Sequence, residues 1–138
     1  MYLEPTQESG RLLMERGITG PVTMLNLLRF RAVADYSSFP DLAPAVPISG
    51  REAYELYAAH TCPFLAAVGG DLQFLGAGGF NLIGPPEERW DLVMLVRQAS
   101  VESFFAMAQN AEYLAGLGHR SAALEDSRLL PIVEIDRI

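Results

Sequence analysis

The chain has 138 residues, of which 50% are hydrophobic and 20% are charged, a balance typical of a globular protein with one core. All ten basic residues are arginines, and 17 acidic residues give a net charge of −7, which disfavours a nucleic-acid partner. No apolar run approaches the roughly 20 residues of a membrane span, and the first residues lack the pattern of a signal peptide. We therefore expect a single domain over residues 1–138, located in the cytoplasm and without membrane contact.

The first predicted helix begins after Thr6, whose hydroxyl can cap it, and ends at Gly17, which suits the left-handed conformation at a helix end. Residues 22–31 then form a nearly continuous apolar run, which is typical of a central strand covered on both faces. Asn26 interrupts this run, and a buried amide must find partners or cost about 1–3 kcal/mol. Asn26 is therefore the first candidate for a functional residue.

Residues 32–48 contain three prolines and show neither helical nor strand periodicity, so they are predicted to form a long loop. Such loops often serve as lids, binding loops or subunit arms, although a plain surface excursion is an equal alternative. A capping box at Ser49 and Glu52 begins the next helix, and Gly69 ends it. Its apolar stripe recurs every three or four residues and consists of Tyr54, Tyr57, Ala58, Thr61, Leu65 and Val68.

The second half of the chain contains two strands followed by a helical region. Residues 71–83 form a strand with three glycines in its middle, which indicates a bulge or a close backbone approach. The glycines do not predict a phosphate-binding loop, because no helix start follows them. A turn at residues 84–89 leads to a second strongly apolar strand at residues 90–98.

Ser100 is expected to cap a helix that is interrupted near Asn110, which can itself cap a second helical segment over residues 111–124. Residues 128–135 form the last predicted strand. Pro131 lies within this strand and lacks an amide hydrogen, so the strand is expected at a sheet edge.

This order of strand, helix, strand, strand, helix, strand predicts an α+β fold of the ferredoxin-like type, βαββαβ, with an antiparallel four-stranded sheet. The N-terminal helix and the loop of residues 32–48 are additions to it. Two helices cover only one face of such a sheet, so an apolar second face requires a partner. We expect a homodimer.

Five segments resemble a bacterial domain-of-unknown-function family in the dimeric α+β barrel superfamily: GPVTMLNLLRFR, PISGREAY, ERWDLVMLVR, NAEYLAGLGHR and AALEDSRLLPI. The resemblance covers residues 20–132 and implies a dimeric α+β barrel, but it transfers no reaction. The wider superfamily includes antibiotic-biosynthesis monooxygenases, muconolactone-isomerase-like enzymes and haem-degrading monooxygenases. In several of these the ligand pocket lies between the sheet and its helices.

Asn26 is similar to an asparagine on the first strand of the haem-degrading relatives. Matching Tyr113 to the aromatic residue of their last helix places Leu117 where their haem ligand lies, with His119 two residues further on. The single cysteine, Cys62, excludes an intrachain disulfide and is expected to be a small buried residue. We therefore expect no metal, haem or nucleotide cofactor.

Two classes of function fit these residues. In the first, a small-molecule enzyme, Asn26 hydrogen-bonds a carbonyl or enolate and His60 or His119 transfers a proton near neutral pH. The candidate substrate-binding residues are Arg97, Tyr113 and Arg120, of which the arginines would hold an anionic group.

In the second class, the chain is a non-catalytic ligand-binding or assembly module. Asn26 then hydrogen-bonds neighbouring backbone groups, and both histidines lie on solvated helix flanks. Arg120 caps a helix or pairs with Glu112 or Glu125. A pocket with convergent polar groups near Asn26 distinguishes the enzyme from the module. Asn26 is expected to share the helix-covered face of its strand with the even-numbered residues Val22, Met24, Leu28 and Phe30, while Arg29 and Arg31 occupy the other face.

Overall fold

The computed structural model describes every residue from Met1 to Ile138. Its helices and strands follow one another as α1 (Gln7–Glu15), β1 (Val22–Phe30), the short 3-10 helix η1 (Pro40–Leu42), α2 (Gly50–Ala67), β2 (Asp71–Phe80), β3 (Arg89–Gln98), α3 (Val101–Ala108), α4 (Ala111–Leu114), α5 (Leu117–Ala123) and β4 (Leu124–Ile132).

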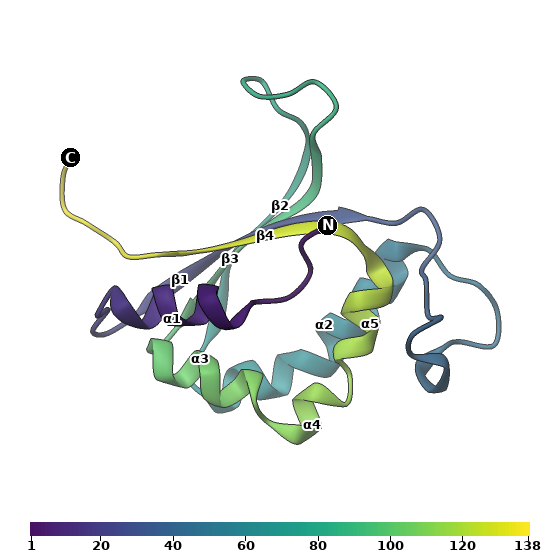
Figure 1. Cartoon of the computed structure of the whole chain (residues 1–138), viewed down its shortest axis with the longest axis horizontal. Helices are drawn as coiled ribbons and strands as arrows, with labels where there is room; N and C mark the ends of the chain where they lie inside the picture. The colour runs from purple at the N-terminus through teal and green to yellow at the C-terminus, as the bar shows by residue number, and fades with distance from the viewer.

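The four strands form one antiparallel sheet in the order β2-β3-β1-β4, and the helices lie on one side of it (Figure 1). The predicted α+β, ferredoxin-like architecture is confirmed, with β1 and β3 in the centre and Pro131 in an edge strand. None of the helices combines the length and the apolar character that crossing a membrane requires.

Two predicted elements differ clearly from the structure, and the strands expected to end at residues 83 and 135 end at Phe80 and Ile132. The expected helix over residues 111–124 is divided into α4 and α5 at Gly116, where a Cβ atom would lie 2.1 Å from the ring of His60. The chain therefore packs directly against α2 at this point. The last strand begins at Leu124 instead of residue 128, because Leu124 pairs with Phe30 in the β1 ladder and is completely buried.

The irregularity of β2 also differs from the expectation. The register shifts between Leu72 and Phe74, before the glycines, so the bulge does not lie where the glycines are; of the two predicted alternatives, the glycines fit the close backbone approach. A Cβ atom at Gly78 would lie 2.2 Å from the carbonyl oxygen of Trp90, so the two strands approach closely there. A close backbone approach is thus present, but the bulge lies elsewhere.

The core lies between the sheet and the helices. The prediction that even-numbered β1 residues face the helices is confirmed, because they are buried and the intervening residues are not: Val22, Met24, Leu28 and Phe30. On α2 the buried stripe is narrower than predicted. Ala58 is exposed. Cys62 is exposed as well, so its expected burial is wrong. The reason is that Cys62 lies about 100° around the helix from Thr61, outside the buried stripe.

The N-terminal residues are tied to the edge strand β4. The amide of Tyr2 donates to Oδ1 of Asp126 at 2.9 Å, and Oγ of Ser127 donates to the carbonyl of Tyr2 at 2.6 Å. Further along, Arg16 donates to the carbonyl of Pro131 at 2.8 Å. An uncovered edge strand is a template for unwanted pairing, so these contacts protect one edge of the sheet. The opposite edge, β2, has no such cover and is exposed along most of its length.

We predict that the Asp126 carboxylate makes the free energy of unfolding depend on pH in the acidic range. Burial disfavours its charge, but hydrogen bonds from Tyr2, Arg128 and Ser127 outweigh burial and hold the pKa of Asp126 below its ordinary value of 3.8. A carboxyl with a depressed folded-state pKa contributes stability that is complete above about pH 5 and is lost as the pH falls through the folded value. Asp126→Asn should lower the free energy of unfolding at pH 7 by about 1–3 kcal/mol.

Urea denaturation at pH 7 and pH 3 measures both quantities. The variant should lose less stability than the unchanged protein between these pH values. An identical loss in both proteins would show that Asp126 is not the linked group.

Candidate functional site

Asn26 lies on the helix-covered face of β1, between two separate apolar clusters. Met24 belongs to one cluster with Val22 and Val101, whereas Leu28 belongs to the larger cluster around the aromatic residues of α2. The side chain of Asn26 is half-buried, and its Nδ2 donates to the carbonyl of Met24 at 3.1 Å. Its Oδ1 accepts no hydrogen bond from the protein. Asn26 is thus a polar group with unused hydrogen-bonding capacity at a break in the core.

Two tyrosine hydroxyls meet in the larger cluster. The oxygens of Tyr57 on α2 and Tyr113 on α4 lie 2.8 Å apart, and both residues are more than nine-tenths buried. Burial, and then the neighbouring Tyr57, raises the pKa of Tyr113 above its ordinary value of 10, so its phenol stays protonated near neutral pH. Two hydroxyls that share one hydrogen bond leave one proton without an acceptor. This pair can therefore donate one further hydrogen bond.

Two buried acceptors on the same side of the sheet have no partner. Thr61 lies one turn after Tyr57 on α2, and its Oγ1 makes no hydrogen bond; the same holds for Oε1 of Gln98 at the end of β3. In the ladder between β1 and β3, Gln98 lies opposite Val22 and Asn26 lies opposite Met94. The side-chain amides of Gln98 and Asn26 are therefore four ladder positions, or about 13 Å, apart. Unpartnered buried polar groups are costly and few in native proteins, and each one requires an explanation.

The two histidines lie at the junction of α2, α4 and α5, and neither is hydrogen-bonded to Asn26. Nε2 of His60 is 2.9 Å from the carbonyl of Glu112 and 3.2 Å from that of Tyr113, so this nitrogen carries the proton. Nδ1 of His119 lies 2.8 Å from the hydroxyl of Tyr36. Burial has the largest effect on the pKa of His119 and the nearby His60 the next; both lower it below 6.5, which favours the neutral ring. A neutral ring with its proton on Nε2 accepts the proton of Tyr36 at Nδ1.

Tyr36 is a potentially functional residue that the sequence did not identify. Its partner is 83 positions away in the chain, and no motif joins the two. The only signal was a bulky aromatic residue in a loop composed mainly of small side chains.

Neither candidate arginine is hydrogen-bonded to Asn26. Arg120 donates from Nη1 to the carbonyl of Leu3 and from Nη2 to Oγ of Ser127 at 3.4 Å, so it fixes the N-terminal segment and pairs with neither expected glutamate. Arg97 lies opposite Thr23 in the sheet, which places it on the face that the helices leave open. Nowhere in the chain do three His, Cys, Asp or Glu side chains come together as potential metal ligands.

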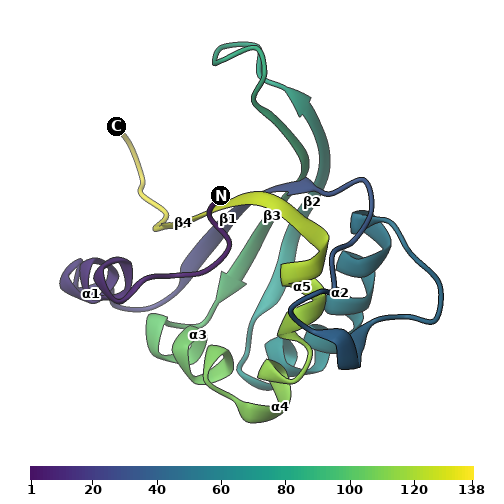
Figure 2. The ribbon, with the colours of Figure 1, turned by 45° about the vertical axis from the view of Figure 1, so that its right-hand side comes forward.

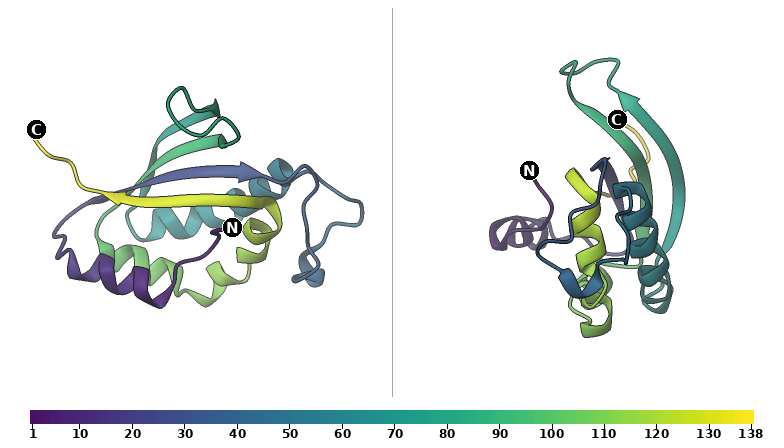
Figure 3. Two further views of the ribbon diagram at one scale, coloured as in Figure 1. Left: turned by 45° about the horizontal axis from the view of Figure 1, so that its top comes forward. Right: turned by 90° about the vertical axis from the view of Figure 1, so that its right-hand side faces the viewer.

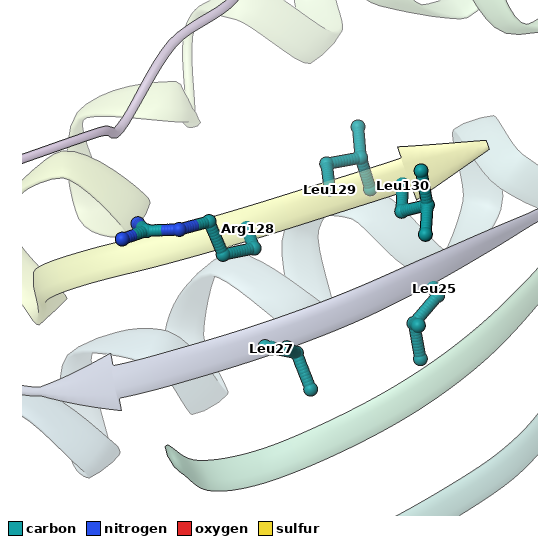
Figure 4. Close-up of a pocket in the computed structure, with 5 residues that line it drawn as sticks. All are labelled: Leu25, Leu27, Arg128, Leu129 and Leu130. Carbon is teal, nitrogen blue, oxygen red and sulfur yellow. The ribbon is translucent and has the colours of Figure 1, made fainter. Parts of the chain in front are cut away.

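The open face of the sheet carries a groove of its own, shown in Figure 4. Its volume is about 370 Å³, and it is lined by β1 and β4 through Leu25, Leu27, Arg128, Leu129 and Leu130. All of these except Arg128 are apolar. Leu25, Leu27, Arg128 and Leu130 lie on the face opposite Asn26, and Leu129, the ladder partner of Asn26, contributes from the edge strand. Asn26 does not line the groove, whose chemistry is that of an apolar contact surface.

These features define an α+β protein of ferredoxin-like fold with a polar break in its helix-covered core. Two crystal structures of the RPA0582 protein from Rhodopseudomonas palustris are similar over nearly the whole chain at 33% identity. That of the methylated protein has a TM-score of 0.84 and covers 98% of this chain and 96% of that chain; the other, described as a protein of unknown function, has a TM-score of 0.83 and covers 99% and 98%. The chain belongs to the same family as RPA0582.

A more distant similarity concerns the fold alone. SnoaB, a cofactor-independent oxygenase from Streptomyces nogalater, has a TM-score of 0.53 at 12% identity, with 87% of this chain and 98% of that chain covered. No protein-family model and no curated protein matches the chain.

We predict that the hydroxyls of Tyr57 and Tyr113 are energetically coupled. Tyr57→Phe or Tyr113→Phe alone leaves the other hydroxyl buried without its partner and should cost about 1–3 kcal/mol in the free energy of unfolding. In the double variant no hydroxyl remains to be satisfied, so its cost should be clearly less than the sum of the two single costs. Urea denaturation of the four proteins measures the coupling. Additive costs would show that the two groups do not share a hydrogen bond.

Proposed function

We propose that this protein binds a small organic molecule between the sheet and the helices and converts it as an enzyme that requires no cofactor. One observation carries the proposal: the helix-covered core contains polar groups with unused hydrogen-bonding capacity, at Asn26, at Thr61 and at the Tyr57–Tyr113 pair. A ligand that satisfies these groups removes the cost of leaving them unpartnered. Asn26 lies between two apolar clusters and the tyrosine pair lies within the larger one, so the surroundings suit a mainly apolar ligand with a few polar atoms.

Each polar group has a definite role in this proposal. Asn26 can donate through its amide and accept through its carboxamide oxygen, so it would orient a carbonyl or an enol of the ligand. The phenol of Tyr113, kept protonated by burial, would donate a hydrogen bond to negative charge that develops on the substrate oxygen. The fold shared with a cofactor-independent oxygenase is compatible with such chemistry.

A non-catalytic binding protein is the second candidate, and the histidines favour it. Both histidine rings are hydrogen-bonded to groups other than Asn26, and no carboxylate is hydrogen-bonded to Asn26. A substrate beside Asn26 would then have a proton donor, Tyr113, but no evident base. Turnover, rather than binding, separates the two candidates.

We predict that Asn26→Leu weakens ligand binding without unfolding the protein, because leucine has the same number of side-chain heavy atoms with the same branching and suits an apolar environment. A panel of small aromatic and lactone-like compounds would be screened by thermal shift, and the compounds found would be measured by calorimetry. Loss of one hydrogen bond worth about 1.4 kcal/mol should weaken binding about tenfold. Asn81→Leu, in the exposed turn after β2, is the matched control.

Equal affinities for the unchanged protein and Asn26→Leu would overturn this site. Oxygen uptake or product formation with the bound compounds would then distinguish the enzyme from the binding protein. Binding without any conversion would favour the second candidate.

We further propose that the protein is a homodimer that pairs the open faces of two sheets. The apolar groove of Leu25, Leu27 and Leu130 supports this arrangement, because apolar surface of this kind is normally covered by a partner. The β2–β3 hairpin extends beyond the end of β1 and bends away from the helices, as does the C-terminal tail (Figure 2, Figure 3). At the hairpin tip Leu82 and Ile83 are 100% and 93% exposed. Both projections flank the open face and would enclose a second copy.

We predict that Leu130→Asp dissociates this dimer. Leu130 lies on the open face of an edge strand, so a carboxylate there would be buried without a partner at the interface but would be solvated in a monomer. Light scattering at micromolar concentration should change from the mass of two chains to that of one, 15.1 kDa. Leu56→Asp, on the exposed side of α2, should remain dimeric. A monomeric unchanged protein would refute the dimer directly.

A further inference from the structure

The loop between β1 and α2 contains a second groove, distinct from both the helix-covered core and the open face of the sheet. Its volume is about 370 Å³, and it is lined by two stretches of the loop that face each other: Val33, Ala34, Tyr36, Ala43, Pro44, Ala45, Val46, Pro47 and Ile48. This volume lies within the range of small-molecule sites. No role in the proposed function uses this groove.

The loop is held in place by α5, so the groove exists before any ligand arrives. The amide of Asp35 donates to the carbonyl of Ala122 at 2.9 Å. A Cβ atom at Gly118 would lie 2.7 Å from side-chain atoms of both Phe39 and Leu42, which shows how closely the loop packs on the helix. Preorganisation of this kind lowers the entropic cost of binding.

The backbone of the groove offers both acceptors and donors. Pro44 and Pro47 have no amide hydrogen. The amides of Ala34 and Ala43 already donate to the carbonyls of Ile48 and Pro40, at 2.9 and 3.2 Å. The amides of the other five lining residues donate to no group of the protein, so the backbone does not select between donor and acceptor ligands, and selection falls to the side chains.

Tyr36 provides the one side-chain polar group. Its hydroxyl lies 2.8 Å from Nδ1 of the half-buried His119 ring. With the ring proton on Nε2, Nδ1 is an acceptor, and the Tyr36 hydroxyl donates its only proton to it. The phenol oxygen keeps its lone pairs for another donor, and a hydroxyl that donates to a strong acceptor becomes a better acceptor itself. A ligand that complements this group must bring an O–H donor.

We propose that the loop groove binds a small neutral molecule with an apolar body and a hydroxyl group, an alcohol or a phenol, whose O–H donates to the oxygen of Tyr36. The apolar body lies against the valine, proline and isoleucine side chains of the loop. His119 acts as a positioning residue, since it orients the Tyr36 hydroxyl and does not touch the ligand. The inference does not depend on the site near Asn26.

The test uses two probes of nearly equal shape, phenol and its methyl ether anisole, titrated into the full chain and followed by amide NMR shifts. Phenol should shift amides of residues 33–48 and bind more tightly than anisole, which has no donor. Tyr36→Phe keeps the ring and removes the oxygen, so phenol should bind about tenfold more weakly while anisole is unaffected. Tyr2→Phe, which removes a phenol on an exposed residue at the N-terminus, is the control and should leave both affinities unchanged.

Equal binding of phenol and anisole to the unchanged protein would overturn the inference even if Tyr36→Phe fails to fold. Unchanged phenol affinity in a folded Tyr36→Phe would overturn it as well. Asn26→Leu separates the two sites, because it should leave the shifts of the loop intact. Phenol shifts that concentrate around Asn26 and disappear in Asn26→Leu would refute the loop site and support the site in the core.

Discussion

The pairing of β1 with β3 in the middle of the sheet is the contact on which the other features of the molecule depend. Both strands are strongly apolar, and the antiparallel ladder between them runs from Val22 to Leu28 of β1. Side chains alternate along a strand, so this one ladder supplies apolar residues to both faces of the sheet. The helices cover one face and create the core around Met24 and Leu28. The other face, with Leu25 and Leu27, is left for a partner, which is the physical basis of the proposed dimer.

Within the covered face, the polar groups are informative because they are costly. A chain under selection for stability alone would fill the position between Met24 and Leu28 with another aliphatic side chain. Asn26 instead separates two apolar clusters. On α2, the hydroxyl of Thr61 is buried without a hydrogen-bond partner. Real proteins violate packing rules mainly where function requires it. The same reasoning does not apply to Asp126, whose charge is fully used in holding the N-terminal segment.

Two polar pairs join segments that are far apart in the chain, and they differ in what they leave available. The Tyr57–Tyr113 pair is enclosed and retains one proton to donate. The Tyr36–His119 pair lies beside a groove and retains an acceptor oxygen. The first suits a ligand with a carbonyl or an anionic oxygen, and the second suits a ligand with a hydroxyl.

The sequence by itself determined the order of the elements, the central position of β1 and β3, the capping box of Ser49 and the face on which Asn26 lies. These features follow from periodicity and from interactions between neighbours in the chain, which are visible in one dimension. Only the tertiary structure decided that helix 111–124 breaks at Gly116, that Cys62 is exposed and that Tyr36 meets His119. Each of these depends on which residue of a distant segment lies within a few ångströms, and local propensity carries no information about such contacts because packing alone brings the segments together.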